Sequence, residues 1–297
     1  MLRMALRVAG LALQIDARES GVRLSVPDCH TKFLVEGTKK QDGLPSLQGL
    51  HLRVRDGPLA AIRGWDPVAC APLVWRLWRR EDGHMLFESL EQVPPSRHLV
   101  VDAGFRTGEI AGDFGHATRS RYPLQDMDIL LLANWLAGWG DLILHAAGAV
   151  IDGDGYCFAG ESGAGKSTIA AALAASGGAV LGEDTVILRC LDDTFWIFGT
   201  PWHTDPSRCS PTGAPLAKLF FPDRAAAHGA VPCSPLQGVS RLMRTAFVPY
   251  YRPDAVAHIL DNLGLLAERV PFFTLNHNLG EDILPLLNPA HRCTAPG

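Results

Sequence analysis

The chain has 297 residues, which is long enough for two ordinary domains, each with its own core. Its 27 basic and 31 acidic side chains give a net charge of −4, and the basic residues form no run, which argues against a nucleic-acid partner. Seven cysteines, none at Cys-x-x-Cys spacing, favour reduced thiols in a cytoplasmic protein over a zinc site or a disulfide framework.

The N-terminal part of the chain predicts a small domain rich in strands. The apolar run Val8–Leu13 predicts a first strand rather than a secretion signal, because Gln14 and Asp16 follow it at once. Short apolar runs separated by turn sequences continue to about Asp113. Three tryptophans are expected in core or interface packing, with a partner-binding surface as the alternative: Trp65, Trp75 and Trp78.

A polar stretch at residues 112–123 predicts the boundary between two domains, which we place at 1–118 and 119–297. After it, either Asp126 or Asp128 is expected to cap a helix that ends near residue 137.

The apolar stretch Ile129–Ile151 is interrupted by polar residues and glycines, so we expect a helix followed by a buried strand, and no membrane partner. The strand is predicted at Leu142–Ile151 and a second strand at Tyr156–Ala159. The Asp-Gly-Asp-Gly sequence at 152–155 between them predicts a hairpin turn, because it lacks the spaced ligands and closing glutamate of a calcium loop. An antiparallel hairpin here departs from the usual parallel architecture of nucleotide-binding sheets.

The segment Gly160–Ser167 has the pattern Gly-x-x-x-x-Gly-Lys-Ser of a phosphate-binding loop, and an alanine-rich helix is predicted at Thr168–Ala175. Glycines let backbone N–H groups turn toward phosphate oxygens, lysine adds a charge, and the serine hydroxyl suits Mg²⁺. The pattern predicts ATP and Mg²⁺, against the alternative of a glycine-rich turn that only caps a helix. The expected nucleotide-binding residues are Gly160, Glu161, Ser162, Gly163, Ala164, Gly165, Lys166, Ser167 and Thr168.

The remainder alternates short strands and helices, typical of an α/β domain with several antiparallel strands. Strands are predicted at Ala179–Leu181, Thr185–Cys190, Thr194–Phe198 and Phe272–Leu275, and helices at Leu236–Thr245 and Asp254–Glu268.

Two adjacent acids, Glu183 and Asp184, follow the predicted strand after the loop helix. A carboxylate there can face the terminal phosphate, where it holds Mg²⁺ or accepts a proton from an attacking hydroxyl. Neighbouring side chains point in opposite directions, so one acid is expected to serve the site, and we favour Asp184. Four other residues are candidates for the site. His145 and His203 are either site histidines or ordinary packed residues, and Arg208 and Lys218 either bind a phosphate or are solvated.

The run His145–Ile151, the hairpin, the loop Gly160–Ser167 and the acids at 183–184 resemble the catalytic segment of the HPr kinase/phosphorylase family. The resemblance covers about residues 142–200. More loosely, residues 199–203 and 215–221 resemble a divergent branch of HPr-kinase-like proteins, some of them associated with modified-peptide gene clusters.

The resemblance implies an α/β fold with an HPr-kinase-like, PEP-carboxykinase-like core and a mixed sheet. It implies that Asp184 deprotonates an acceptor serine, that Lys166 stabilises the transferred phosphoryl group, and that His145 orients or charge-balances the site. Ser167 would bind Mg²⁺.

The chain departs from the family at two points. Glu183 stands where the family has aspartate, and the family's Glu-Ile-Arg-Gly-like signature, which supplies a magnesium ligand, has no counterpart, since no glutamate occurs between Glu183 and Glu268. Either Glu183 or an aspartate such as Asp205 must replace that ligand, or serine and water hold the metal. The resemblance therefore does not establish docking of a carrier protein or a phosphorylase activity, and both stay open.

The sequence thus favours a kinase that transfers a phosphoryl group to a serine of a peptide or small protein. A nucleotide-binding or scaffold module without turnover, and transfer to a small metabolite, remain alternatives. The acceptor, the nucleotide base and a homo-oligomeric state stay open.

Overall fold

The computed structural model describes residues 1–35, 49–59, 61–72, 74–90, 96–114, 121–125, 127–203, 205–223, 228–277 and 283–287. The chain divides into two compact units, Met1–Trp135 and Leu136–Gly297. The division falls inside helix α2 (Asp128–Ala137), whereas the sequence places the domain boundary at residue 118, which lies outside the described residues. Each unit contains a mixed sheet, so the fold is mixed α/β.

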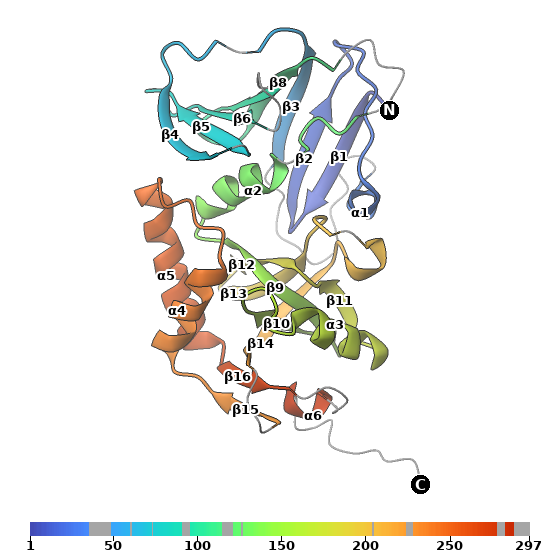
Figure 1. Ribbon diagram of the computed structural model, residues 1–297, viewed down its shortest axis with the longest axis vertical. Coiled ribbons are helices and arrows are strands. Elements are labelled where there is room, and N and C mark those ends of the chain that lie inside the picture. Colours follow the sequence, from blue (N-terminus) through green and yellow to red (C-terminus); the bar gives the residue numbers. More distant parts are fainter. Residues whose placement is uncertain are drawn as a thin grey trace. The chain divides into compact units, whose positions relative to one another are not determined.

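The first unit is an eight-stranded sheet in the order β1-β2-β3-β8-β7-β6-β5-β4 (Figure 1). The pairs β2–β3 and β3–β8 are parallel and the others antiparallel. Its elements are β1 (Arg3–Val8), β2 (Leu11–Asp16), α1 (Asp28–Thr31), β3 (Gly49–Asp56), β4 (Asp66–Ala71), β5 (Trp75–Arg79), β6 (Met85–Ser89), β7 (Arg97–Val101), β8 (Thr107–Gly112) and the start of α2.

The single first strand expected at residues 8–13 is wrong, because a hairpin turn divides that run. Ala9 and Gly10 both have positive φ, 50° and 78°, as a two-residue hairpin turn requires. Leu6 of β1 then faces Leu13 of β2, and both side chains are buried. The apolar run spans the turn because both strands contribute to one core.

Trp65, Trp75 and Trp78 are half-buried rather than part of the core of this unit. Arg80 lies over the ring of Trp65, with its guanidinium carbon 5.1 Å from the ring centroid, and Arg76 lies 5.5 Å from that of Trp78. Cation–π contacts of this kind let a large ring remain partly at the surface.

The second unit holds strand β10 at the centre of its sheet, between an antiparallel and a parallel neighbour. The sheet runs β10-β9-β12-β13-β14-β16-β15, β11 pairs with β9, and β10 also pairs in parallel with β14. Its elements are β9 (Leu142–Ile151), β10 (Asp154–Ala159), α3 (Lys166–Ala175), β11 (Ala179–Gly182), β12 (Thr185–Leu191), β13 (Thr194–Gly199), the 3₁₀ helix η1 (Pro206–Arg208), β14 (Gly213–Asp223), β15 (Gly229–Pro232), α4 (Pro235–Thr245), α5 (Pro253–Arg269), β16 (Phe272–Asn276) and α6 (Leu284–Leu287).

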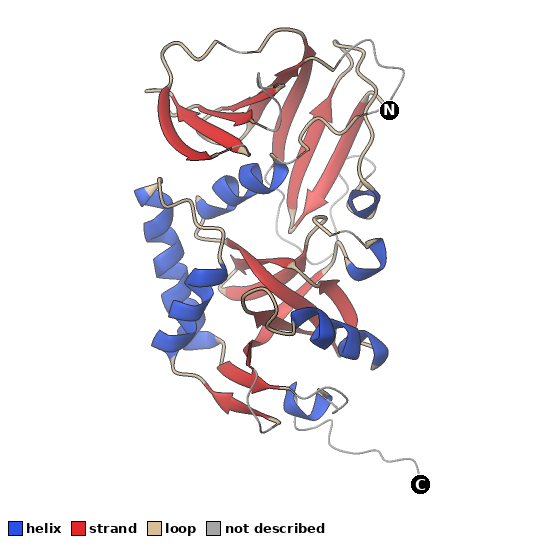
Figure 2. Ribbon diagram, in the orientation of Figure 1, coloured by secondary structure: helices blue, strands red, loops and turns tan. Residues whose placement is uncertain are grey.

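Helices cover both faces of this sheet (Figure 2). Successive side chains of β10 point to opposite faces of the sheet, so the strand contributes to the core on both faces. On one face, Tyr156 and Phe158 pack with Ile169 and Leu173 of α3. On the opposite face, Cys157 joins residues of α4 and α5 in a second core cluster. Burial raises the pKa of the Cys157 thiol far above its usual value, so this cysteine is an apolar core residue.

Most elements predicted for the second unit are confirmed to within one or two residues, including the hairpin of β9 and β10. Its turn is formed by Asp152 and Gly153, with φ of 52° and 89°. Asp128 begins α2, while Asp126, the other expected cap, lies outside the described residues. No helix among the described residues has the length and apolar character needed to cross a membrane.

Strands β14 and β15 were not predicted. Pro215 and Pro222 interrupt the apolar run of β14, and a proline inside a run argues against a central strand. Here Pro215 lies in the segment that pairs with β13, and Pro222 lies next to the strand's end. The six residues between them include the buried Leu219, Phe220 and Phe221 and pair on both sides, with β10 and β16.

Candidate functional site

The glycine-rich segment joins the end of β10 to the start of α3, in the strand–loop–helix arrangement that the sequence predicts. Gly163 and Gly165 have φ of 80° and 95°, a left-handed conformation that favours glycine. Gly165 is the N-cap residue of α3, and no side chain accepts a hydrogen bond from the first turn. A helix N-terminus without a capping side chain is a favourable place for an anion.

Lys166 is buried beneath this loop, with 5 % of its surface exposed. Its ammonium donates to the carbonyl oxygens of Gly160 (2.8 Å) and Glu161 (2.9 Å), and to Nε2 of His145 at 2.9 Å. An ammonium has three N–H donors, so these contacts account for all of them. Burial lowers the pKa of Lys166, and the carboxylate of Asp184 opposes this shift.

His145 lies on β9 and links Lys166 to Asp184. Its Nδ1 is 3.2 Å from Oδ1 of Asp184. Because Nε2 accepts from the lysine, a neutral ring carries its proton on Nδ1 and donates it to the carboxylate. Lys166, His145 and Asp184 therefore form a continuous chain of polar contacts.

The pairing of β9 with β12 brings this chain together. Thr185, the first residue of β12, lies opposite His145, and the Ala146 N–H donates to the Asp184 carbonyl at 3.0 Å. The loop follows β10, which pairs with the other half of β9. One long strand thus sets the distance between the glycine-rich loop and the acidic pair.

The two adjacent acids have different partners. The Asp184 side chain is 60 % exposed and faces His145, whereas that of Glu183 is 18 % exposed and lies 2.6 Å from Nη1 of Arg208. The hydrogen bond to Glu183 raises the pKa of Arg208. Glu183, expected as a metal ligand, is thus already paired with a cation.

Asp205, the other expected substitute for the missing glutamate, caps helix η1. Its Oδ1 accepts from the Ser207 backbone N–H at 2.8 Å, and its Oδ2 lies 3.3 Å from Nε of Arg208. Mg²⁺ carried by a nucleotide keeps several waters and takes few protein ligands. Among the described residues no group of three His, Cys, Asp or Glu could form a metal cage. With the exposed Ser167 beside the loop, the site fits a magnesium ion that arrives with a nucleotide.

The other two candidates lie in different surroundings. His203 is partly buried, with Nε2 3.1 Å from the Thr200 hydroxyl, behind the acidic pair. Lys218 donates to the Leu287 carbonyl at 2.5 Å and faces the ring of Phe273, so its ammonium is engaged away from the loop. The Glu183–Arg208 pair and the Thr200–His203 contact were missed by sequence reasoning, since neither has a recognisable spacing.

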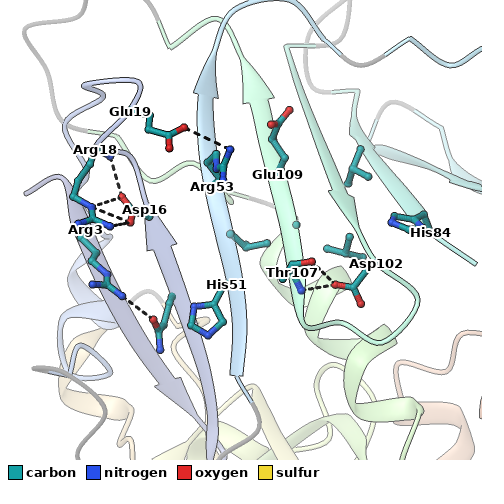
Figure 3. A pocket seen from close by; sticks show the side chains of 15 residues that line it. Arg3, Asp16, Arg18, Glu19, His51, Arg53, His84, Asp102, Thr107 and Glu109 are labelled. Carbon is teal, nitrogen blue, oxygen red and sulfur yellow. Dashed lines mark hydrogen bonds and ion pairs between the residues drawn. The ribbon is translucent and has the colours of Figure 1, made fainter.

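A cavity of about 650 Å³ lies on the sheet of the first unit, among residues for which the sequence predicts no chemistry (Figure 3). Two ion pairs lie among its charged side chains: Arg18 with Asp16 at 2.6 Å, and Arg53 with Glu19 at 3.5 Å. The Asp102 carboxylate accepts from the hydroxyl of Thr107 at 2.7 Å. The carboxylates of Asp16, Glu19 and Asp102 thus have partners within the cavity.

No protein-family model matches the chain, and no curated protein matches it. Among solved structures, the HPr(Ser) kinase/phosphatase from Coxiella burnetii aligns with a TM-score of 0.27 and 15 % identity. The alignment covers 49 % of this chain and 84 % of that one. At this TM-score the similarity establishes neither a common fold nor a common activity.

Proposed function

We propose that the chain is an ATP-dependent, Mg²⁺-assisted kinase that transfers a phosphoryl group to the serine hydroxyl of a peptide or small protein. The observation that carries this proposal is the chain of contacts from Lys166 through His145 to Asp184, at the glycine-rich loop. A cation for the phosphates and a carboxylate for the hydroxyl proton recur in sites of phosphoryl transfer, and here a histidine joins the two.

In the proposed reaction, the loop N–H groups and the first turn of α3 bind the phosphates. Lys166 exchanges its contacts with the Gly160 and Glu161 carbonyls for phosphate oxygens, and stabilises the charge on the transferred group. When bound, Mg²⁺ would neutralise part of the charge of the phosphates. Ser167 would hold it, with water.

Asp184 acts as the base. The acceptor oxygen forms a bond to the γ-phosphorus as the bond to the β,γ-bridging oxygen breaks, and the hydroxyl proton passes to the Asp184 carboxylate. The products are ADP, a phosphoserine and a proton. His145 orients the carboxylate through its Nδ1–H. When the Lys166 ammonium moves to the phosphate oxygens, its hydrogen bond to Nε2 of His145 breaks.

A non-catalytic nucleotide-binding or scaffold module is the second candidate, and one observation favours it. Glu183 is paired with Arg208 at 2.6 Å, and Asp205 caps η1, so both expected replacements for the family's metal-binding glutamate are engaged. A site that binds nucleotide without a second acidic metal ligand can lose turnover while keeping affinity.

Incubation with Mg²⁺ and γ-labelled ATP, together with a pool of serine-containing peptides, separates these functions by mass spectrometry. The kinase predicts a peptide that gains one phosphate on serine and ADP formed in equal amount. Nucleotide binding without any labelled product would support the binding module instead. Label found only on small molecules would replace the peptide acceptor with a metabolite.

A further inference from the structure

A chain of buried, hydrogen-bonded polar side chains begins at Thr185, the residue that directly follows the acidic pair. It consists of Thr185, Thr200 and His203. Thr185 is 4 % exposed and Thr200 is 0 % exposed. The Thr200 hydroxyl lies 3.0 Å from the Thr185 carbonyl oxygen, 2.7 Å from the Thr185 hydroxyl and 3.1 Å from Nε2 of His203. Three polar contacts therefore converge on one fully buried oxygen.

The direction of each hydrogen bond follows from counting protons. The Thr185 carbonyl can only accept, so Thr200 donates its single hydroxyl proton there. The two remaining contacts must then be donated to Thr200, by the Thr185 hydroxyl and by Nε2–H of His203. His203 is accordingly the Nε2–H tautomer. Burial lowers the pKa of His203, although Asp184 and Glu183 act in the opposite direction, which agrees with a neutral ring.

The His203 ring is packed against the backbone that leads into the acidic pair. A Cβ atom on Gly182 would lie 2.7 Å from Nε2 of His203 and 2.6 Å from the Thr185 carbonyl oxygen, closer than such atoms approach. The absence of a side chain at Gly182 thus leaves room for the imidazole. The same segment is tied by Ser210, whose N–H donates to the Leu181 carbonyl at 3.0 Å.

These contacts hold the two peptide units that follow Asp184. Its own carbonyl accepts from Ala146, and the next carbonyl, of Thr185, accepts from Thr200. The Asp184 side chain is 60 % exposed, so side-chain packing does little to hold it. Its distance to His145 therefore depends on how well the backbone is held.

We propose that Thr200 and His203 are positioning residues for Asp184, which fix the Gly182–Thr185 turn so that the carboxylate stays within reach of His145 and of an acceptor hydroxyl. This inference rests on the proposed kinase function. Neither residue touches the reacting atoms; both act through the backbone of the turn.

The test compares four variants with the wild-type protein. Thr200→Val is nearly isosteric but removes the central hydroxyl, and Thr200→Ser restores it. His203→Leu removes the donor, whereas His203→Gln returns an amide N–H near the position of Nε2. Thr245→Val is the matched control, because Thr245 is also buried, at 8 %, and its hydroxyl donates to the Leu242 carbonyl on α4.

Three quantities are measured: the single-turnover transfer rate with a peptide acceptor, the Kd for ATP, and the histidine tautomers by ¹⁵N NMR. Thr200→Val and His203→Leu are expected to slow transfer by about 10- to 100-fold, because a displaced catalytic group loses rate steeply. The Kd for ATP is expected to stay within about two-fold, since the loop is untouched. Thr200→Ser and His203→Gln are expected to regain most of the rate, and Thr245→Val to keep it.

The wild-type NMR spectrum is expected to show Nε2–H for His203. Wild-type transfer rates in both Thr200→Val and His203→Leu would overturn the positioning role while leaving the kinase in place, as would an Nδ1–H tautomer at His203. Equal losses in Thr245→Val would show a general packing effect and would also overturn it. If the wild-type protein forms no phosphorylated product, the proposed function fails and the positioning role fails with it.

Discussion

Replacement of Asp184 by asparagine is expected to lower the rate of phosphoryl transfer by about 10²- to 10⁴-fold, the usual contribution of a positioned base. Asparagine has nearly the same shape, and its amide oxygen can still accept from Nδ1 of His145, which lies 3.2 Å away. It cannot take up the hydroxyl proton. The Kd for ATP is expected to stay within about two-fold, because Lys166 and the loop are unchanged.

Single-turnover transfer with a peptide acceptor, together with calorimetric titration of ATP, measures both quantities. Asp193→Asn is the control, since Asp193 is 88 % exposed in the turn between β12 and β13. It is expected to transfer at the wild-type rate. Wild-type transfer by Asp184→Asn would exclude Asp184 as the base, and an equal loss of ATP affinity would mean that it serves binding instead.

Replacement of Asp141 by alanine is expected to lower the free energy of unfolding by about 3–5 kcal/mol, as breaking a buried ion pair does. Asp141 is 3 % exposed, just before β9, and its Oδ2 lies 2.7 Å from Nε of Arg189 on β12. Its Oδ1 accepts from the Cys190 backbone N–H at 3.0 Å. The pair ties together the strand that carries His145 and the strand that follows Asp184.

Urea denaturation measures this loss. Burial raises the pKa of Asp141 even with Arg189 beside it, and the loss of Asp141 removes both the carboxylate partner of Arg189 and the acceptor of the Cys190 N–H. The double variant Asp141→Ala/Arg189→Ala is therefore expected to lose less than the two single variants together. Asp193→Asn, which removes the charge of the exposed pair with Arg269 and suits the positive φ of 62° at this position, is expected to cost about 1 kcal/mol or less. Equal losses at positions 141 and 193 would contradict this account.

The second unit could be predicted from sequence because local signals and tertiary packing agree there. Asp152 and Gly153 suit the positive φ of a hairpin turn, and Leu142–Ile151 is apolar because β9 is covered on both faces. The first strand was mistaken because periodicity gave no sign of the turn at Ala9. Strand β14 was missed because a proline such as Pro215 argues against a strand. In the structure the segment is a strand because it pairs with β10 on one side and with β16 on the other.

The candidate site was predicted in part. The loop pattern indicated Lys166, the position of the acidic pair favoured Asp184, and the family resemblance added weight to His145. The structure places His145 in contact with both of the others, and the roles of the three residues stay predictions. The partner of Glu183 could not be predicted, because the strands β12 and β13 and a loop separate Arg208 from it along the chain. Such a pair forms because β13 runs antiparallel to β12 and brings the chain back beside Glu183. The spacing of residues along the sequence does not reveal this.

The proposed kinase requires that the loop Gly160–Ser167 binds a nucleoside triphosphate. Calorimetric titration with Mg²⁺·ATP and Mg²⁺·ADP, on the wild-type protein and on Lys166→Ala, tests it most directly. The wild-type protein is expected to bind ATP, and Lys166→Ala is expected to bind it about 100-fold more weakly because it loses a charge-assisted contact to the terminal phosphates. The loss is expected to be smaller for ADP. Absence of wild-type binding, or equal affinity in Lys166→Ala, would contradict the nucleotide site and the kinase that rests on it.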